Sequence, residues 1–192
     1  MKLTRFLALA AFALPVLAHA HPGHDGHELT WDFTSGATHP LAGWDHLLAM
    51  IAVGLWAAQL GGRSRWLVPA VFVSCMALGA ALAHAGFTPL GIEQGVAASI
   101  FVLGLLVVAA VRPSAAVSAM LIGGFALFHG TAHGAEMPVT ANGFSYGVGF
   151  VGTTICLHLA GLGLGTALQG RERASRLAGG VVALAGVVVF VL

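Results

Sequence analysis

The chain has 192 residues, of which 58% are hydrophobic and only 8% carry a formal charge, and its mean hydropathy is +0.91. Soluble domains usually contain about 25% charged residues, so this composition indicates an integral membrane protein. The formal net charge of +1 provides no broad basic surface and argues against nucleic-acid binding. Ten histidines outnumber the eight Lys and Arg residues and the seven Asp and Glu residues, and this excess is the strongest functional indication in the composition.

Residues 1–20 have the pattern of a cleaved secretory signal peptide. Lys2 and Arg5 form a positive start, residues 6–17 form an apolar core, and Ala-His-Ala at 18–20 is an A-x-A cleavage site. An uncleaved first transmembrane helix is the alternative, but the apolar run is short for a span. Cleavage would leave His21 as the mature N-terminus on the periplasmic side.

The next segment, residues 21–38, is polar and rich in Gly and Pro, and it predicts a flexible periplasmic arm. His21 and His24 stand in the run HPGHDGHE, where three histidines and two carboxylates within eight residues could capture a metal ion loosely. A merely soluble leader explains the same residues equally well.

Six apolar runs follow, each near the ~20 residues that cross a bilayer. They predict an all-α polytopic membrane protein, a compact bundle whose spans lie at about 40–60, 66–86, 90–111, 115–136, 144–168 and 174–192. After the signal peptide, the positive charges occur only in the first, third and fifth connections. By the positive-inside rule these connections face the cytoplasm, and the mature N-terminus and the C-terminus face the periplasm. The residues concerned are Arg63, Arg65, Arg112, Arg171, Arg173 and Arg176.

The fourth span ends in the motif FHGTAHGAE at residues 128–136. In a helix, the i, i+4, i+7 spacing places His129, His133 and Glu136 on one face. Two imidazoles and a carboxylate are ligands for a divalent metal. A histidine pair that hydrogen-bonds across a helix interface is the alternative.

The first span opens with a second polar motif, HPLAGWDH at residues 39–46. His39 and His46 are seven residues apart and would share a helix face. Asp45, the residue before His46, would lie on the adjacent face. The predicted topology places this motif and the 128–136 motif at matched depth, roughly 10 Å below the outer surface. Two such clusters at one depth favour a metal site or metal path over isolated packing roles.

Other ionisable residues near that side are secondary candidates. His84 ends the second span, Glu93 opens the third, and His158 lies deepest, in the middle of the fifth. For His84 or His158 alone, a hydrogen-bonded packing role is at least as well supported as ligation. Imidazole with carboxylate suits Ni²⁺, Co²⁺ or Zn²⁺ better than Cu⁺.

Two other functional classes use intramembrane histidines. A b-type cytochrome would use His46 and His129 as axial haem ligands, although the neighbouring carboxylates and the His-rich arm fit haem poorly. An intramembrane metal-dependent enzyme would use Glu136 as a general base, but the chain contains no H-E-x-x-H motif.

The two motifs, with the leader that ends before HPGH, resemble those of the HupE/UreJ family of nickel and cobalt permeases over essentially the whole chain. The first motif is also distantly similar to the H-x₄-D-H motif of larger nickel/cobalt transporters, but here five residues separate His39 from Asp45.

The resemblance implies a cytoplasmic-membrane permease that supplies metal for hydrogenase, urease or cobalamin. It implies no permanently bound cofactor, with Ni²⁺ or Co²⁺ as transported substrate, and the chain contains no nucleotide-binding motif. The residues it implicates in metal recognition are His39, Asp45, His46, His129, His133 and Glu136.

Overall fold

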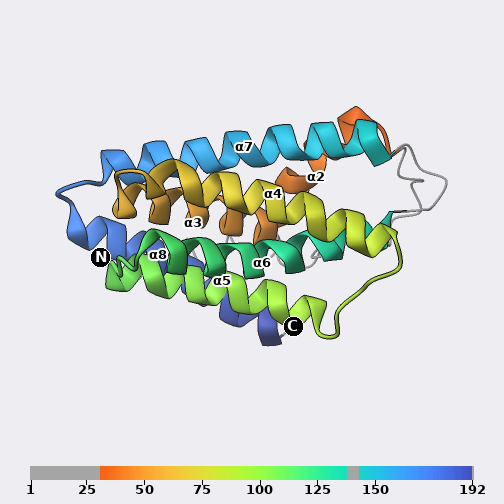
Figure 1. Cartoon of the computed structure of the whole chain (residues 1–192). Coiled ribbons are helices and arrows are strands. Elements are labelled where there is room, and N and C mark those ends of the chain that lie inside the picture. Colours follow the sequence, from red (N-terminus) through yellow and green to blue (C-terminus); the bar gives the residue numbers. More distant parts are fainter. Residues whose placement is uncertain (1–30, 138–142, 192) are drawn as a thin grey trace, which may run out of the picture.

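The computed structural model describes residues 31–137 and 143–191, which form seven α-helices and, within those residues, no strand (Figure 1). The predicted signal peptide, His21 and His24 lie outside the described residues. The helices are α2 (Phe33–Ala42), α3 (Trp44–Leu60), α4 (Ser64–His84), α5 (Ile92–Ala109), α6 (Ala115–Glu136), α7 (Gly143–Ala167) and α8 (Glu172–Val191).

The helices α4 to α8 are each long and apolar enough to cross a membrane. Helix α3 has 17 residues, a length of ~26 Å that falls short of a ~30 Å hydrocarbon core. Together with α2 it satisfies the length and hydropathy of a sixth span, bent by 82° at the break between them. The prediction of an all-α bundle of membrane-spanning helices is therefore confirmed.

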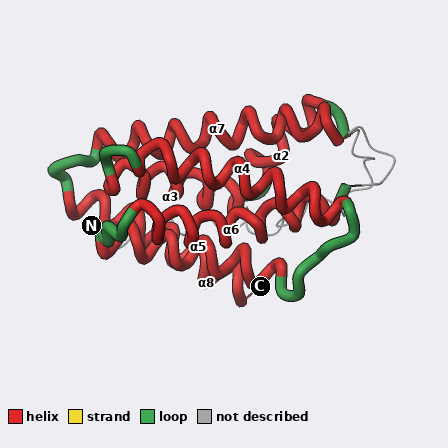
Figure 2. Tube along the Cα trace, in the orientation of Figure 1, coloured by secondary structure: helices red, strands yellow, loops and turns green. Residues whose placement is uncertain are grey.

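Connections between the helices collect at the two ends of the bundle, as Figure 2 shows in green. The α3–α4, α5–α6 and α7–α8 connections lie together at the left end in Figure 1. They carry or adjoin all six arginines of the described residues, so we name this the arginine end. The α4–α5 connection and the C-terminal end of α6 lie at the opposite end, as the alternation of antiparallel spans predicts.

The first span departs from the prediction of one helix over residues 40–60. Gly43 adopts an extended conformation, with φ −89° and ψ 111°, and separates α2 from α3. The bend also removes the argument that His39 and His46 share a helix face. Residues 33–38, expected in the flexible arm, are instead the first turns of α2. Asp32 and Ser35 cap the N-terminus of this helix with a capping box.

The other helix ends lie within two residues of the predicted spans. Helix α5 begins after Gly91, which has a left-handed φ of 71° that glycine adopts without strain.

Glycines allow α3 and α7, α4 and α6, and α5 and α8 to pack backbone against backbone. A methyl group on Gly54 would meet the backbone of α7 near His158, and one on Gly130 would meet the carbonyl of Met76 on α4. Gly104 faces the backbone of α8 at Ala183 in the same way. Small residues at such contacts are the usual means by which membrane helices associate, because lipid supplies no hydrophobic driving force between them.

Large apolar side chains fill the centre and also cover the outside. Trp56, Phe72 and Ile100 are fully buried, whereas Leu177 and Leu184 of α8 are 72% and 66% exposed. An apolar exterior of this extent suits contact with hydrocarbon.

The contact between α4 and α6 provides a test of this packing. We expect Gly130→Ala to destabilise the protein by about 1–3 kcal/mol, because the added methyl group must push against the backbone of Met76. Gly124→Ala on the same helix is the matched control, since nothing lies within 4 Å of its added methyl group. Thermal unfolding of both variants in one detergent checks this; an equal Tm for the two would contradict it.

Candidate metal centre

Helix α2 is held against α7 by close backbone contact. Methyl groups on Gly36 and Gly149 would meet the backbone of the facing helix, at Tyr146 and Phe33 respectively. The Thr153 hydroxyl donates a hydrogen bond of 2.7 Å to the carbonyl of Ala37. These contacts prevent α2 from sliding along α7. They therefore fix the position of the last turn of α2, which carries His39.

The break at Gly43 turns the chain from α2 into α3 and places Asp45 in the first turn of α3. Asp45 is 8% exposed, and its Oδ1 atom lies 3.0 Å from Nδ1 of His46. A methyl group on Gly43 would lie 2.8 Å from this carboxylate oxygen and 3.3 Å from the same ring nitrogen. A side chain at this position would therefore displace the Asp45 carboxylate or the His46 ring.

The fourth span, α6, carries the candidate ligands that face those of α2 and α3. His129 and His133 are buried, and Glu136 is exposed at the C-terminal end of the helix. Their helix faces α4 through Gly130 and Gly134, which approach the backbone of Met76 and Ala80.

The two motifs meet, as their matched depths predict. The ring centroids of His46 and His133 are 4.4 Å apart, and those of His46 and His129 are 5.2 Å apart. The ring of His39 lies 4.8 Å from that of His133 and 6.5 Å from that of His46. Four imidazoles from α2, α3 and α6 thus form one cluster, which we call the histidine cluster.

Two rings of this cluster come close to the spacing of a metal site together with Glu136. Among the described residues, His39, His133 and Glu136 each offer a ligand atom, and these atoms lie within 4.8 Å of one another. Metal–ligand bonds of ~2 Å place two ligand atoms on one ion ~3–4 Å apart, so small side-chain movements would close the triad. An imidazole pair with one carboxylate is a donor set for Ni²⁺, Co²⁺ or Zn²⁺.

Several nitrogens of the histidine cluster have no hydrogen-bond partner among the described residues. They are both ring nitrogens of His133, Nε2 of His46 and Nδ1 of His129. Buried polar atoms are normally paired, so these nitrogens are available to a ligand or to water.

The secondary candidates have different surroundings. His84 is exposed near the end of α4, and Glu93 is exposed at the start of α5; neither belongs to the triad. His158 is 1% exposed, and neither of its ring nitrogens has a hydrogen-bond partner among residues 31–137 and 143–191. Its ring lies 5.1 Å from Phe72, which in turn lies 5.6 Å from His129.

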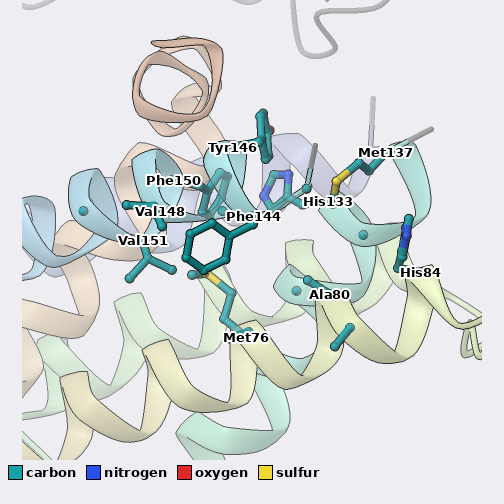
Figure 3. Close-up of a pocket in the computed structure, with 17 residues that line it drawn as sticks. Met76, Ala80, His84, His133, Met137, Phe144, Tyr146, Val148, Phe150 and Val151 are labelled. Atoms are coloured by element: carbon teal, nitrogen blue, oxygen red, sulfur yellow. The ribbon is translucent and has the colours of Figure 1, made fainter. Parts of the chain in front are cut away.

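A cavity of about 710 Å³ borders the histidine cluster between α4, α6 and α7. Its lining is apolar apart from His84, His133 and Tyr146. Figure 3 shows His133 and Tyr146 on one side of it, with Met76 and Phe144 across from them and His84 apart. The cavity thus reaches the buried ring of His133 from the side of the bundle.

The motifs did not reveal three residues that shape the cluster. Phe150 packs 4.4 Å from the ring of His133, Phe72 separates His129 from His158, and the Ser99 hydroxyl lies 2.8 Å from Nε2 of His129. The aromatic residues look like ordinary core residues in sequence. Ser99 is a polar residue within an apolar span, which is the only signal that could have pointed to it.

Comparison with known proteins shows a match over nearly the whole chain. A sequence model of the family described as HupE / UreJ protein matches residues 7–189. Protein HupE of Rhizobium leguminosarum bv. viciae is 44% identical over 186 residues, which cover 95% of each chain. No solved structure matches this chain.

The tight turn at Gly43 can be tested directly. We expect Gly43→Ala to weaken Co²⁺ binding by the purified protein roughly tenfold or more, because its methyl group displaces the Asp45 carboxylate or the His46 ring. Gly163→Ala on α7, whose methyl group meets nothing within 4 Å, is the control. Titration followed by the Co²⁺ absorption spectrum measures both affinities, and equal values would show that this turn does not shape the site.

Proposed function

Because this chain belongs to the HupE/UreJ family, which is associated with nickel and cobalt transport, we propose that it carries Ni²⁺ or Co²⁺ across the cytoplasmic membrane into the cell. It acts as a permease and not as an enzyme, and the ion is its substrate. The metal serves the maturation of hydrogenase or urease, or the synthesis of cobalamin, as the family resemblance implies.

The observation that carries this proposal is the triad of His39, His133 and Glu136. Two motifs, at residues 39–46 and 128–136, place three ligand atoms within 4.8 Å of one another. An arrangement without a metal-binding role would pair these side chains with ordinary hydrogen-bond partners, yet both nitrogens of His133 have none in the described part of the chain.

The charges near the triad suit a dication. Glu136 and Asp45 offset part of the electrostatic cost of holding two positive charges in an apolar bundle. The exposed carboxylate of Glu136 would meet the ion first, and the buried rings of His133 and His129 follow along α6. Partial replacement of water by imidazole is the chemistry expected for Ni²⁺ and Co²⁺.

The position of the arginines and the membrane potential both favour inward transport. The arginine end faces the cytoplasm by the positive-inside rule, so the triad faces the periplasm. A dication moving inward gains about 4.6 kcal/mol per 100 mV of membrane potential, twice the value for one charge. This gradient supplies a driving force without nucleotide hydrolysis, and the His-rich arm that carries His21 and His24 raises the metal concentration outside.

The cytochrome alternative is less well supported by the geometry. The rings of His46 and His129 meet edge to face at 5.2 Å, with an interplanar angle of 90°. Axial haem ligands lie on opposite sides of a porphyrin plane, and these rings leave no space for one between them. An absorption spectrum of the purified protein distinguishes haem from a non-haem metal site.

Uptake measurements test the proposal. We expect His133→Ala and Glu136→Gln each to lower the accumulation of radioactive Ni²⁺ or Co²⁺ in expressing cells roughly tenfold or more, because each removes one of three ligands. Excess unlabelled Ni²⁺, Co²⁺ or Zn²⁺ in the same assay identifies the preferred ion. Glu172→Gln, an exposed carboxylate at the arginine end, is the control for the loss of a carboxylate. Wild-type accumulation in both triad variants would refute the transport site.

His158 lies beyond the triad on the proposed path of the ion and provides a second test. His158 lies across Phe72 from His129. One turn earlier on the same helix, the buried hydroxyl of Thr154 also has no partner in the part of the chain that the structure describes. We expect His158→Ala to reduce uptake severalfold while Co²⁺ affinity at the triad stays within about twofold, since distant sites contribute independently. Loss of both properties together would indicate that His158 acts by supporting the fold.

A further inference from the structure

Two rings of the histidine cluster are each engaged at one nitrogen and open at the other. His46 contacts Asp45 through Nδ1, and His129 contacts Ser99 through Nε2. The remaining nitrogens, Nε2 of His46 and Nδ1 of His129, are buried and have no partner among the described residues.

Asp45 lies beside one nitrogen of His46. Its Oδ1 atom is 3.0 Å from Nδ1, and the negative charge of the carboxylate favours the ring proton on that side, although Oδ1 makes no hydrogen bond among the described residues. Nε2 then presents the lone pair. A carboxylate that orients a histidine in this way is the common arrangement behind metal ligands.

Ser99 has the same effect on His129. Its hydroxyl is 2.6 Å from the carbonyl of Val96 and 2.8 Å from Nε2 of His129. A hydroxyl has one proton, and the shorter contact to a carbonyl acceptor takes it. Ser99 can then only accept from His129, so Nε2 carries the ring proton and Nδ1 is bare.

The two bare nitrogens belong to rings in contact. The rings of His46 and His129 lie 5.2 Å apart and perpendicular to each other. His129 is one turn, or ~6 Å, nearer the arginine end of α6 than His133. His133 lies 4.4 Å from His46, so it adjoins both the triad and this pair.

We propose that His46 Nε2 and His129 Nδ1 form a second binding site for the divalent cation, one helical turn inward of the triad, and that Ser99 is the positioning residue that keeps Nδ1 bare. This inference rests on the proposed transport function. The ion passes from Glu136 and His39 to the pair through His133, with water completing its coordination. The two sites hold the ion in turn, because two dications this close repel each other strongly.

A nitrogen that is already bare binds metal without a prior shift of the ring proton to the other nitrogen. In the opposite tautomer that shift would have to precede binding and would weaken it. Asp45 acts in this arrangement as the carboxylate beside His46, behind the ligand, whereas Glu136 is a direct ligand.

Solid-state ¹⁵N NMR of the full chain in bilayers, labelled at histidine, tests the assignment. Protonated and bare ring nitrogens give separate resonances, and the His129 signals are those missing from His129→Ala. Zn²⁺ is the probe because it is diamagnetic. We expect wild-type His129 to have its proton on Nε2 and its Nδ1 signal to shift on adding Zn²⁺.

Variants of Ser99 separate positioning from packing. We expect Ser99→Ala to give a mixture of His129 tautomers and roughly tenfold or greater loss of Zn²⁺ affinity, within the range found when partners behind metal ligands are removed. Ser99→Thr keeps the hydroxyl and should restore both readouts. Ser118→Ala removes another fully buried serine hydroxyl, on α6, and should change neither.

The outcomes distinguish this inference from the transport function. If Ser99→Ala and His129→Ala keep wild-type Zn²⁺ affinity and uptake while His133→Ala abolishes uptake, the second site is wrong and the transport function stands. A proton on Nδ1 of His129 in the wild-type protein also overturns the second site. If His133→Ala also leaves metal uptake at the wild-type level, the proposed transport function is wrong.

Discussion

Close contact between helix backbones holds the histidine cluster together. Gly36 and Gly149 let α2 lie directly on α7, and Gly130 and Gly134 let α6 lie directly on α4. A side chain at any of these positions would move one helix away from the other. The ring of His39 would then move away from that of His133, so the spacing of the ligands depends on residues that have no ligand atoms.

These helices bring together polar groups that the bundle itself does not pair. Unpaired buried polar groups destabilise a protein by about 1–3 kcal/mol each, and the free energy of unfolding of a typical domain is only about 5–15 kcal/mol. Several nitrogens of His46, His129 and His133 lack a hydrogen-bond partner among the described residues. A cation bound at these nitrogens, as we propose, would offset the cost of burying them.

The composition and the apolar runs predicted most of the fold. The spans were predictable because a bilayer requires long apolar helices. The arginines gather at one end of the bundle, as the alternation of the spans predicts. The break at Gly43 was not predictable, since an isolated glycine within an apolar run is common in membrane helices. The break also shows why a helical-face argument for His39 and His46 is wrong, although both residues still reach the cluster: α2 folds back onto α7 and carries His39 with it.

By itself, the sequence determined the class of protein, the order of its spans, and which side chains could bind a metal. These properties depend on residue type and short-range spacing, which are written directly in the chain. Only the tertiary structure decided that His39, His133 and Glu136 form the triad and that Ser99 contacts His129. Ligand distances and tautomers depend on contacts between segments far apart in sequence, and those contacts are set by packing across the whole bundle.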